Sequence, residues 1–572
     1  MNVAMLALAG SLPIATVFVL LVGLRWSAAK AMGVGWVLAS GLGLFLWQMQ
    51  TTWWAAAAFY GALQAVEIIL IVFGAILLMN HLKGSGAVTT IRWHFSRITE
   101  DRRVQVLLIG LGFVTLIEGA AGFGTPGALA APLLIGLGFP ALAAAVFALI
   151  FNGSQPPFGA AGTPVIGGIG AVIDEGVLGD VALSTFLNDV TAWTAVVTSS
   201  ALVFWGLVGV YLLLFWFGRD DERSLRGALQ GTLPVAPFAL LLGALAGATQ
   251  LIVAWLFGPE LPNIAAGFVV LGAGVVLVRR GVLIPEETWD FPEREAWPER
   301  WLGNVDEEEG EKQDEGNGEE TEEEPERRMP VLLAWTPYLI VALVLIVTRW
   351  PDLGIADWLR ERSLDIERIL GEDLSFSLEY LYLPGVIPFI PVALLTALLH
   401  RMDRASVVTA WRESASQIVS PAVTLIVAVS MTQVMIQSAT NPIDEPGMME
   451  ALSQVVALGA GTLLPAVAPW IGTLGSFMTG SNTSSNVLFS VFQHDAASDV
   501  GVSRTIVVAL QNVGGGIGNM LAVLNIAAIC GVIRMTGMEG DILRKMLVPT
   551  VVFALFASLA GMLLTWLLPD LY

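Results

Sequence analysis

The nine residues Glu118 to Pro126 read EGAAGFGTP and interrupt a run of apolar residues. Glycine and proline each weaken or break a helix, so this stretch cannot remain helical at low cost. Within lipid every backbone N–H and C=O must be hydrogen-bonded, and irregular backbone is tolerated only inside protein or along a wet cavity. The stretch therefore predicts a broken helix inside a larger membrane-embedded assembly.

The chain around this stretch is too apolar for a water-soluble protein. Of its 572 residues, 55% are hydrophobic and 13% are charged, whereas soluble domains carry about 25% charged residues. Apolar stretches such as 4–24, 331–347 and 546–568 approach the roughly 20 residues that cross a hydrocarbon core. We expect an all-α polytopic membrane protein with about 12–14 transmembrane spans in the lipid bilayer. The first stretch has no basic n-region and is interpreted as a retained helix.

Charge is concentrated in one segment. Residues 285–328 contain 19 acids and 5 bases, while the whole chain has a net charge of −21 and only four lysines. Acidic, lysine-poor loops suit a protein of an extreme halophile, because strong salt screens self-repulsion; a generic disordered acidic loop is the alternative. The acidic balance argues against nucleic-acid binding.

The acidic segment divides the chain into three parts. We expect an N-terminal transmembrane half at residues 1–280, an acidic, disordered cytoplasmic loop at 281–328, and a C-terminal transmembrane half at 329–572. Low-complexity runs of Glu, Gly and Asn cannot bury enough apolar area to fold. Lys and Arg counts in the short loops predict an external N-terminus, a cytoplasmic acidic loop and an external segment 351–383.

Three further breaks accompany the first one. They are predicted at 152–164 (NGSQPPFGAAGTP), 479–486 (TGSNTSSN) and 511–519 (QNVGGGIGN), so each half has two breaks about thirty residues apart. Paired interruptions in matching positions of two halves indicate a transporter site near the bilayer midplane, where free N–H groups face an anionic substrate. The alternative is that the small residues only let helices pack closely. The residues expected to bind substrate are Gly122, Gly124, Thr125, Asn152, Gly162, Thr163, Ser481, Asn482, Thr483, Ser484, Ser485, Asn486 and Asn512.

Two carboxylates lie within apolar spans. Glu118 opens the first break, and Glu67 lies inside the apolar stretch 62–79. An ionisable side chain inside a membrane is costly and is by default a functional candidate. We expect Glu118, and as a second candidate Glu67, to carry the coupling proton or cation. The alternative for Glu118 is a structural carboxylate that hydrogen-bonds the glycine-rich backbone.

Several classes of protein are disfavoured by the motifs. The chain contains neither an HExxH zinc motif nor a GxxxxGK[ST] phosphate loop. Its single cysteine, Cys530, cannot form an internal disulfide. We therefore expect no enzyme activity, no metal site and no cofactor. The expected partners are a small organic-acid anion, a coupling proton and possible further copies of the chain in a homo-oligomer.

The motifs resemble those of the L-lactate permease family of organic-acid symporters. The similarity is carried by EGAAGFGTP, by the AAGTP that ends the second break, and by FMTGSNTSSNVLFSVFQ at 477–493, with GPELPN at 258–263 and LLAWTPYLI at 332–340. It implies proton-coupled uptake of L-lactate and related small 2-hydroxy monocarboxylates, such as glycolate, across the plasma membrane. The chain departs from the family pattern at Asn482, where the family has Asp, and at Asn519 and 521–525, where it tends to have Lys and a Ser-Pro-Gln-Ser tract.

Other functions remain open at the level of sequence. A passive channel or a membrane scaffold would carry out no coupled transport, although paired breaks favour a symporter. A transporter of another anion, or one coupled to sodium, would have the same pattern of spans and breaks.

Overall fold

The computed structural model describes residues 2–24, 26–95, 97–173, 175–302, 329–350, 353–535 and 537–568. Asp174 and most of the acidic loop lie outside the described residues. Within them, 12 helices are long and apolar enough to cross a membrane, or up to 13 if a bent pair forms one further span. The prediction of an all-α membrane protein with 12–14 spans is therefore confirmed.

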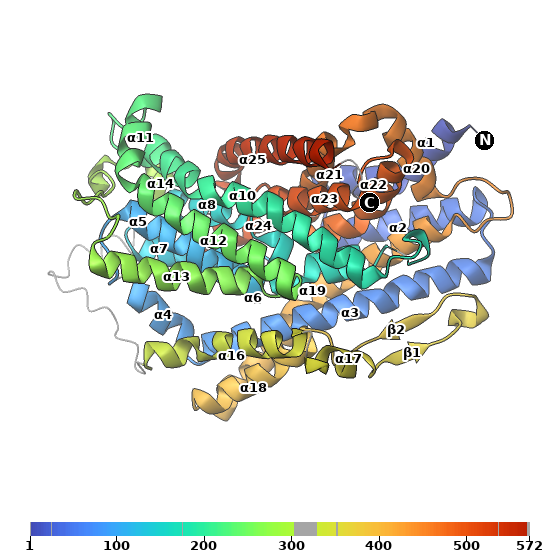
Figure 1. Ribbon diagram of the computed structural model, residues 1–572, viewed down its shortest axis with the longest axis horizontal. Coiled ribbons are helices and arrows are strands. Elements are labelled where there is room, and N and C mark those ends of the chain that lie inside the picture. Colours follow the sequence, from blue (N-terminus) through green and yellow to red (C-terminus); the bar gives the residue numbers. More distant parts are fainter. Residues whose placement is uncertain are drawn as a thin grey trace.

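The long spans run lengthwise in Figure 1, as α3, α13, α16 and α25 show. Their bounds are α1 (Val3–Phe18, extended by a π-helical turn to Gly23), α2 (Ala28–Phe45), α3 (Thr51–Gly84), α5 to α6 (Arg102–Ala120), α10 (Leu183–Phe217), α11 to α12 (Leu225–Phe257), α13 (Pro262–Arg280), α16 (Val331–Arg349), α19 (Arg404–Gln437), α20 to α21 (Met448–Thr479), α23 to α24 (Arg504–Val532) and α25 (Glu539–Leu567).

Shorter elements fill the spaces between these spans. They are α4 (Ala87–Phe95), α7 (Thr125–Gly136), α8 (Ala141–Asn152), the 3-10 turn η3 (Pro156–Phe158), α9 (Gly159–Thr163), the π-helical turn η4 (Pro164–Ile169), α14 (Glu299–Leu302), α17 (Ile355–Arg360), α18 (Ile390–Leu399) and α22 (Asn482–Val500). One antiparallel hairpin, β1 (Leu364–Ile366) with β2 (Phe376–Leu378), pairs Leu364 with Leu378.

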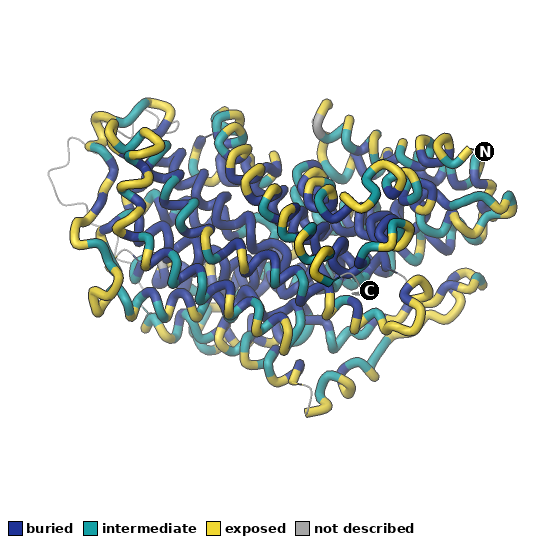
Figure 2. Tube along the Cα trace, turned by 45° about the horizontal axis from the view of Figure 1, so that its top comes forward, coloured by how far each residue is buried: buried dark blue, intermediate teal, exposed yellow. Residues whose placement is uncertain are grey.

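Helices from the two ends of the chain interleave. The long α19 packs along α3, α20 packs on α1, and α23 packs on α10. The centre of the assembly is buried, while exposed residues gather at its ends and along its outer faces (Figure 2). The span α5 to α6 is entirely buried by its neighbours. A broken helix placed there is shielded from lipid, as the requirement for bonded backbone groups demands.

The apolar residues 128–151 form two helices, α7 and α8, because Gly138 adopts a positive φ of 93° and Pro140 precedes α8. Two of the predicted breaks need correction. The break at 479–486 is confined to Gly480 and Ser481, and residues 482–486 form the first turns of α22, which Ser481 caps. Polar residues at a helix start satisfy free N–H groups, so the polar run begins a helix and does not interrupt one.

The predicted break at 511–519 is also displaced. Residues 504–518 form the unbroken helix α23, and the chain leaves the helix only at 519–522. The glycines instead allow close contact with α21, since a Cβ on Gly514 would lie 2.1 Å from the Pro469 carbonyl oxygen and one on Gly518 would lie 2.2 Å from that of Thr473. Small residues have this packing role at tight helix interfaces in membranes.

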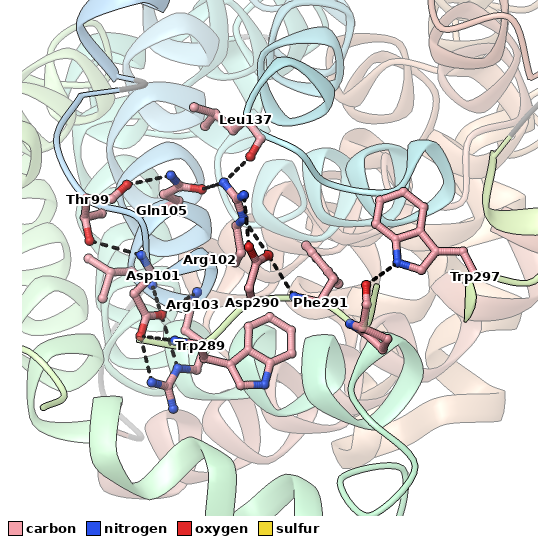
Figure 3. A network of polar contacts seen from close by, with 12 residues as sticks. Thr99, Asp101, Arg102, Arg103, Gln105, Leu137, Trp289, Asp290, Phe291 and Trp297 are labelled. Carbon is pink, nitrogen blue, oxygen red and sulfur yellow. Dashed lines mark hydrogen bonds and ion pairs between the residues drawn. The ribbon is translucent and has the colours of Figure 1, made fainter. Parts of the chain in front are cut away.

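The segment after α13 folds back onto the start of α5. Asp101 binds Arg103 at 2.7 Å and accepts a hydrogen bond from the Trp289 N–H at 3.1 Å, while Arg102 pairs with Asp290 at 2.8 Å (Figure 3). Trp289 is also buried. Residues 281–328 were expected to be one disordered loop; residues 281–302 instead form a docked strap, because their aromatic side chains bury against the helices. Residues 303–328 lie outside the described residues.

Candidate functional site

The first break is a short left-handed segment at the end of α6. Gly122, Phe123 and Gly124 have φ values of 58°, 50° and 76°. Left-handed backbone is unfavourable for residues with a Cβ, so the two glycines make this turn possible. Thr125 and Pro126 then begin α7, where proline is tolerated because its missing N–H would have no helical partner.

The second break repeats this arrangement. Ala160, Ala161 and Gly162 have φ values of 41°, 50° and 77°, and Thr163 and Pro164 lead into η4. The Thr163 hydroxyl donates a hydrogen bond to the Ala160 carbonyl at 2.5 Å and so braces the turn from within. Two alanines in left-handed conformation are strained, and such strain persists where the surrounding structure holds it for a function.

Glu118 joins the two breaks. Its side chain is 3% exposed and is hydrogen-bonded to the Asn152 side chain. A Cβ built on Gly159 would lie 2.3 Å from Glu118 Oε1, and one on Gly122 would lie 3.5 Å from it. Among the described residues, Glu118 Oε2 and Asn152 Oδ1 are buried without a hydrogen-bond partner. Two open acceptors at one joint provide a place for a proton or a donor group of a ligand.

A second polar cluster is built by α22 and α23. Asn512 Oδ1 accepts hydrogen bonds from the side-chain amides of Asn482 and Asn486, each at 2.9 Å, and Asn512 donates to Thr194 Oγ1 at 3.3 Å. Ser485 accepts from Gln511 at 3.0 Å. Thr483 and Ser484 are buried beside them, and Asn482 Oδ1 has no partner among the described residues.

The fourth break brings these parts together. A Cβ on Gly124 would lie 3.4 Å from Asn525 Oδ1, and one on Gly480 would lie 3.1 Å from the Leu524 side chain, so two distant breaks flank the start of α24. A Cβ on Gly153 would likewise lie 2.4 Å from the Met520 side chain. The four breaks therefore meet in one region, which we call the polar core: residues 118–125, 152–164, 480–486 and 511–525.

The turn η4 connects the polar core to a cavity. Asn486 donates to the Pro164 carbonyl at 2.9 Å, and a Cβ on Gly168 would lie 3.0 Å from the Asn486 Cβ. Ile166, in the same turn, lines a cavity of about 740 Å³. Glu67 lines this cavity as well and lies outside the polar core as defined above. A single π-helical turn thus forms a wall between the cavity and the polar core.

Sequence reasoning missed two buried polar groups. Gln250 donates to Gln155 Oε1 at 2.9 Å and to Asn263 Oδ1 at 2.7 Å, behind the second break. Arg349 donates to Glu260 at 2.9 Å in the cavity wall. Glu260 and Asn263 both belong to the GPELPN tract at 258–263, so the polar residues of that tract could have predicted these two buried groups from the sequence.

Comparisons with known sequences identify the family of this chain. The family model described as L-lactate permease matches residues 6–568. A putative L-lactate permease of Haemophilus influenzae is 28% identical over 87% of this chain and 86% of its own length. Glycolate permease GlcA of Escherichia coli is 28% identical over 96% and 93%, and the L-lactate permease of Escherichia coli is 27% identical over 99% and 98%. The chain therefore belongs to the L-lactate permease family.

Proposed function

We propose that this chain is a secondary active transporter that takes up L-lactate, or a related small 2-hydroxy monocarboxylate such as glycolate, together with protons across the plasma membrane. The observation that carries this proposal is the joint between the two breaks, where Glu118 and Asn152 each hold an unpartnered buried acceptor. A coupling proton on the carboxyl and the hydroxyl of a 2-hydroxy acid are donors that match these acceptors. The names of the relatives point to the same class of substrate.

The substrate carboxylate needs donors, and the start of α22 provides them. Helix N-termini attract anions through free N–H groups and the helix dipole. Residues 481–486 form this start, and the Asn482 and Asn486 amides lie beside it. We place the carboxylate there together with Asn512, and the hydroxyl nearer to Glu118 and Asn152. Gly122, Gly124, Thr125, Gly162 and Thr163 shape the other side of this proposed site.

Substrate reaches the polar core only if a wall moves. The side chains of Asn152, Asn486 and Asn512 are at most 4% exposed. Because η4 is a single turn between the core and the cavity, a displacement of η4 would open the core to the cavity side. Glu67 faces that path and is proposed as a second proton carrier.

Purified full-length protein in proteoliposomes tests the function. We expect labelled L-lactate to accumulate against its gradient when an inward proton gradient is imposed, and glycolate to compete. Accumulation driven only by a sodium gradient would show that sodium, and not the proton, is the coupling ion. Equilibration without accumulation under either gradient would indicate a passive channel. Accumulation of other anions but not of lactate would show that the substrate is another anion.

The charge of the chain supports a further proposal on its environment. With 49 acids against 28 bases and few lysines, the protein is suited to strong salt. We expect the purified protein to unfold at a higher temperature in molar potassium chloride than in dilute buffer. A transition temperature that falls with added salt would argue for an ordinary acidic loop on a protein from dilute surroundings.

A further inference from the structure

The cavity beside η4 has charged residues in its wall. It is lined by α3, η4, the start of α10, the end of α12 with the residues after it, the end of α16, α17, and β2 with the residues that follow it. In Figure 1 the hairpin and α17 lie together beside one end of α3. Two arginines, Arg349 and Arg360, line the cavity and differ in how they are paired.

Arg349 is already neutralised. Its Nε donates to Glu260 Oε1 at 2.9 Å, and its Nη2 donates to the Tyr382 carbonyl at 2.6 Å. The side chains of Arg349 and Glu260 are only 3% and 4% exposed. A buried ion pair of this kind holds two elements in place, and its charge is not free for a ligand.

Arg360 retains binding capacity. Its side chain is 38% exposed, and its ion-pair partner Glu379 is 3.9 Å away, longer than a charge-assisted hydrogen bond. Among the described residues its one hydrogen bond goes from Nη2 to the Tyr382 hydroxyl at 2.8 Å, and the guanidinium lies 4.2 Å from the centre of that ring. A guanidinium has five N–H donors in a fork that fits a carboxylate. The tyrosine thus orients Arg360 and leaves most of its donors open.

The remaining charged groups of the wall are acidic. Five carboxylates and two guanidinium groups line the cavity, which makes the wall negative when all are ionised: Glu67, Glu175, Glu260, Asp357 and Glu379 against Arg349 and Arg360. An anion is repelled by this wall unless carboxylates take up protons. Burial raises the pKa of Glu379 above its ordinary value, with Asp365 adding to the shift while Arg360 and Arg349 oppose it. Glu379 therefore accepts a proton at a less acidic pH than an ordinary glutamate.

We propose that Arg360 is a docking site for the substrate carboxylate in the wall of the cavity, and that Glu379 competes with that carboxylate for the guanidinium. Protonation of Glu379 removes the competitor and reduces the negative charge of the wall, so docking takes up a proton together with the anion. The ligand class rests on the proposed function, because a monocarboxylate is the substrate assumed there. The docked anion would lie on the cavity side of η4, before it enters the polar core.

Binding and transport are measured separately to test this site. Isothermal calorimetry on purified full-length protein gives the Kd for L-lactate, and proteoliposomes give KM at several external pH values. We expect Arg360→Gln to weaken binding and raise KM about tenfold or more, because it removes a charged donor. Arg360→Lys should restore part of the affinity. Glu379→Gln should lower KM at neutral pH and flatten its dependence on pH.

Arg362→Gln is the matched control. Arg362 lies two residues away, stacks on Trp358 at 4.2 Å and pairs with Glu361 at 3.7 Å, and it is not among the residues that line the cavity. It should leave Kd and KM unchanged. Size-exclusion profiles confirm that each variant is folded.

The outcomes separate the two proposals. Unchanged Kd and KM in Arg360→Gln, or an unchanged pH dependence in Glu379→Gln, would overturn the docking site even if the protein accumulates lactate. Wild-type protein that binds lactate through Arg360 but never accumulates it would overturn the transport proposal and leave the docking site in place. Wild-type protein that does not bind L-lactate would overturn the docking site.

Discussion

The carboxyl of Glu118 and the backbone of Gly159 are in direct contact, although they belong to different broken helices. A methyl group at position 159 would lie 2.3 Å from Glu118 Oε1. While Glu118 occupies this space, position 159 has no room for a side chain. This relation connects the first break to the second, and it makes both positions open to test.

Gly159→Ala tests the steric side of this joint. The φ of Gly159 is −70°, which alanine adopts freely, so the change acts through contact and not through backbone strain. We expect a loss of stability of about 1–3 kcal/mol from overpacking, together with strongly reduced lactate uptake. Thermal unfolding in detergent and uptake assays measure the two effects. The control is Gly531→Ala, because a Cβ at Gly531 meets nothing within 4 Å. Equal behaviour of the two variants would contradict the contact.

Glu118→Gln tests the chemical side. Glutamine keeps the size and hydrogen bonding of the acid but cannot ionise. If Glu118 carries the coupling proton, the variant should lose uphill accumulation while exchange of lactate across the membrane continues. If Glu118 only braces the backbone, Glu118→Gln should be mild and Glu118→Ala severe. Normal proton-driven accumulation in the Gln variant would remove Glu118 from the coupling mechanism.

Asn512→Ala tests the cluster between α22 and α23. The change leaves the amides of Asn482 and Asn486 without the acceptor that they share at 2.9 Å. Each buried donor without a partner costs about 1–3 kcal/mol, so we expect a marked fall in the unfolding temperature and a raised KM for lactate. Thr194→Val is the milder comparison, because it removes only the 3.3 Å contact on the other side of Asn512. A KM unchanged in folded Asn512→Ala protein would exclude Asn512 from the substrate site.

Two carboxylates at the contact between α5 and the strap differ in burial: Asp101 at the start of α5 and Asp290 in the strap. Asp101 and Arg103 have side chains that are 5% exposed, whereas Asp290 is 55% exposed in its pair with Arg102. Asp101→Asn keeps a good N-cap for α5 but strands the buried charge of Arg103, and we expect a cost of about 3–5 kcal/mol. Asp290→Asn should cost about 1 kcal/mol or less. Thermal unfolding of the two variants compares them directly, and equal losses would mean that the strap is not held by the buried pair.

The acidic loop is expected to be dispensable. Deletion of residues 306–326, which lie outside the described residues, should leave lactate uptake largely intact because the run is low in complexity and polar. Uptake is compared after normalising for the amount of inserted protein. A normally inserted deletion variant without uptake would show that the loop takes part in transport.

Much of the architecture and part of the site followed from local patterns. Apolar length predicted the spans, and Gly122, Gly124 and Gly162 predicted two breaks correctly, because a left-handed turn before Thr-Pro is encoded within a few residues. The glycines at 514–516 also form a glycine-rich run, but they remain helical. A Cβ on each of them would meet a different neighbour: Pro469 of α21, Asn482 of α22 or Pro157 of η3. Local sequence cannot distinguish a glycine that breaks a helix from one that admits a neighbouring backbone.

Sequence patterns were sufficient to predict a membrane protein, two of its interruptions at 122–124 and 160–162, and the polar residues that accompany them. Which of these residues meet depends on the tertiary structure. Asn486 reaches the carbonyl of Pro164, 322 residues away, and Arg349 reaches Glu260, 89 residues away. The physical reason is that turn and helix preferences act over one or two turns of chain, whereas a contact between distant residues depends on how every helix between them packs in the same bundle.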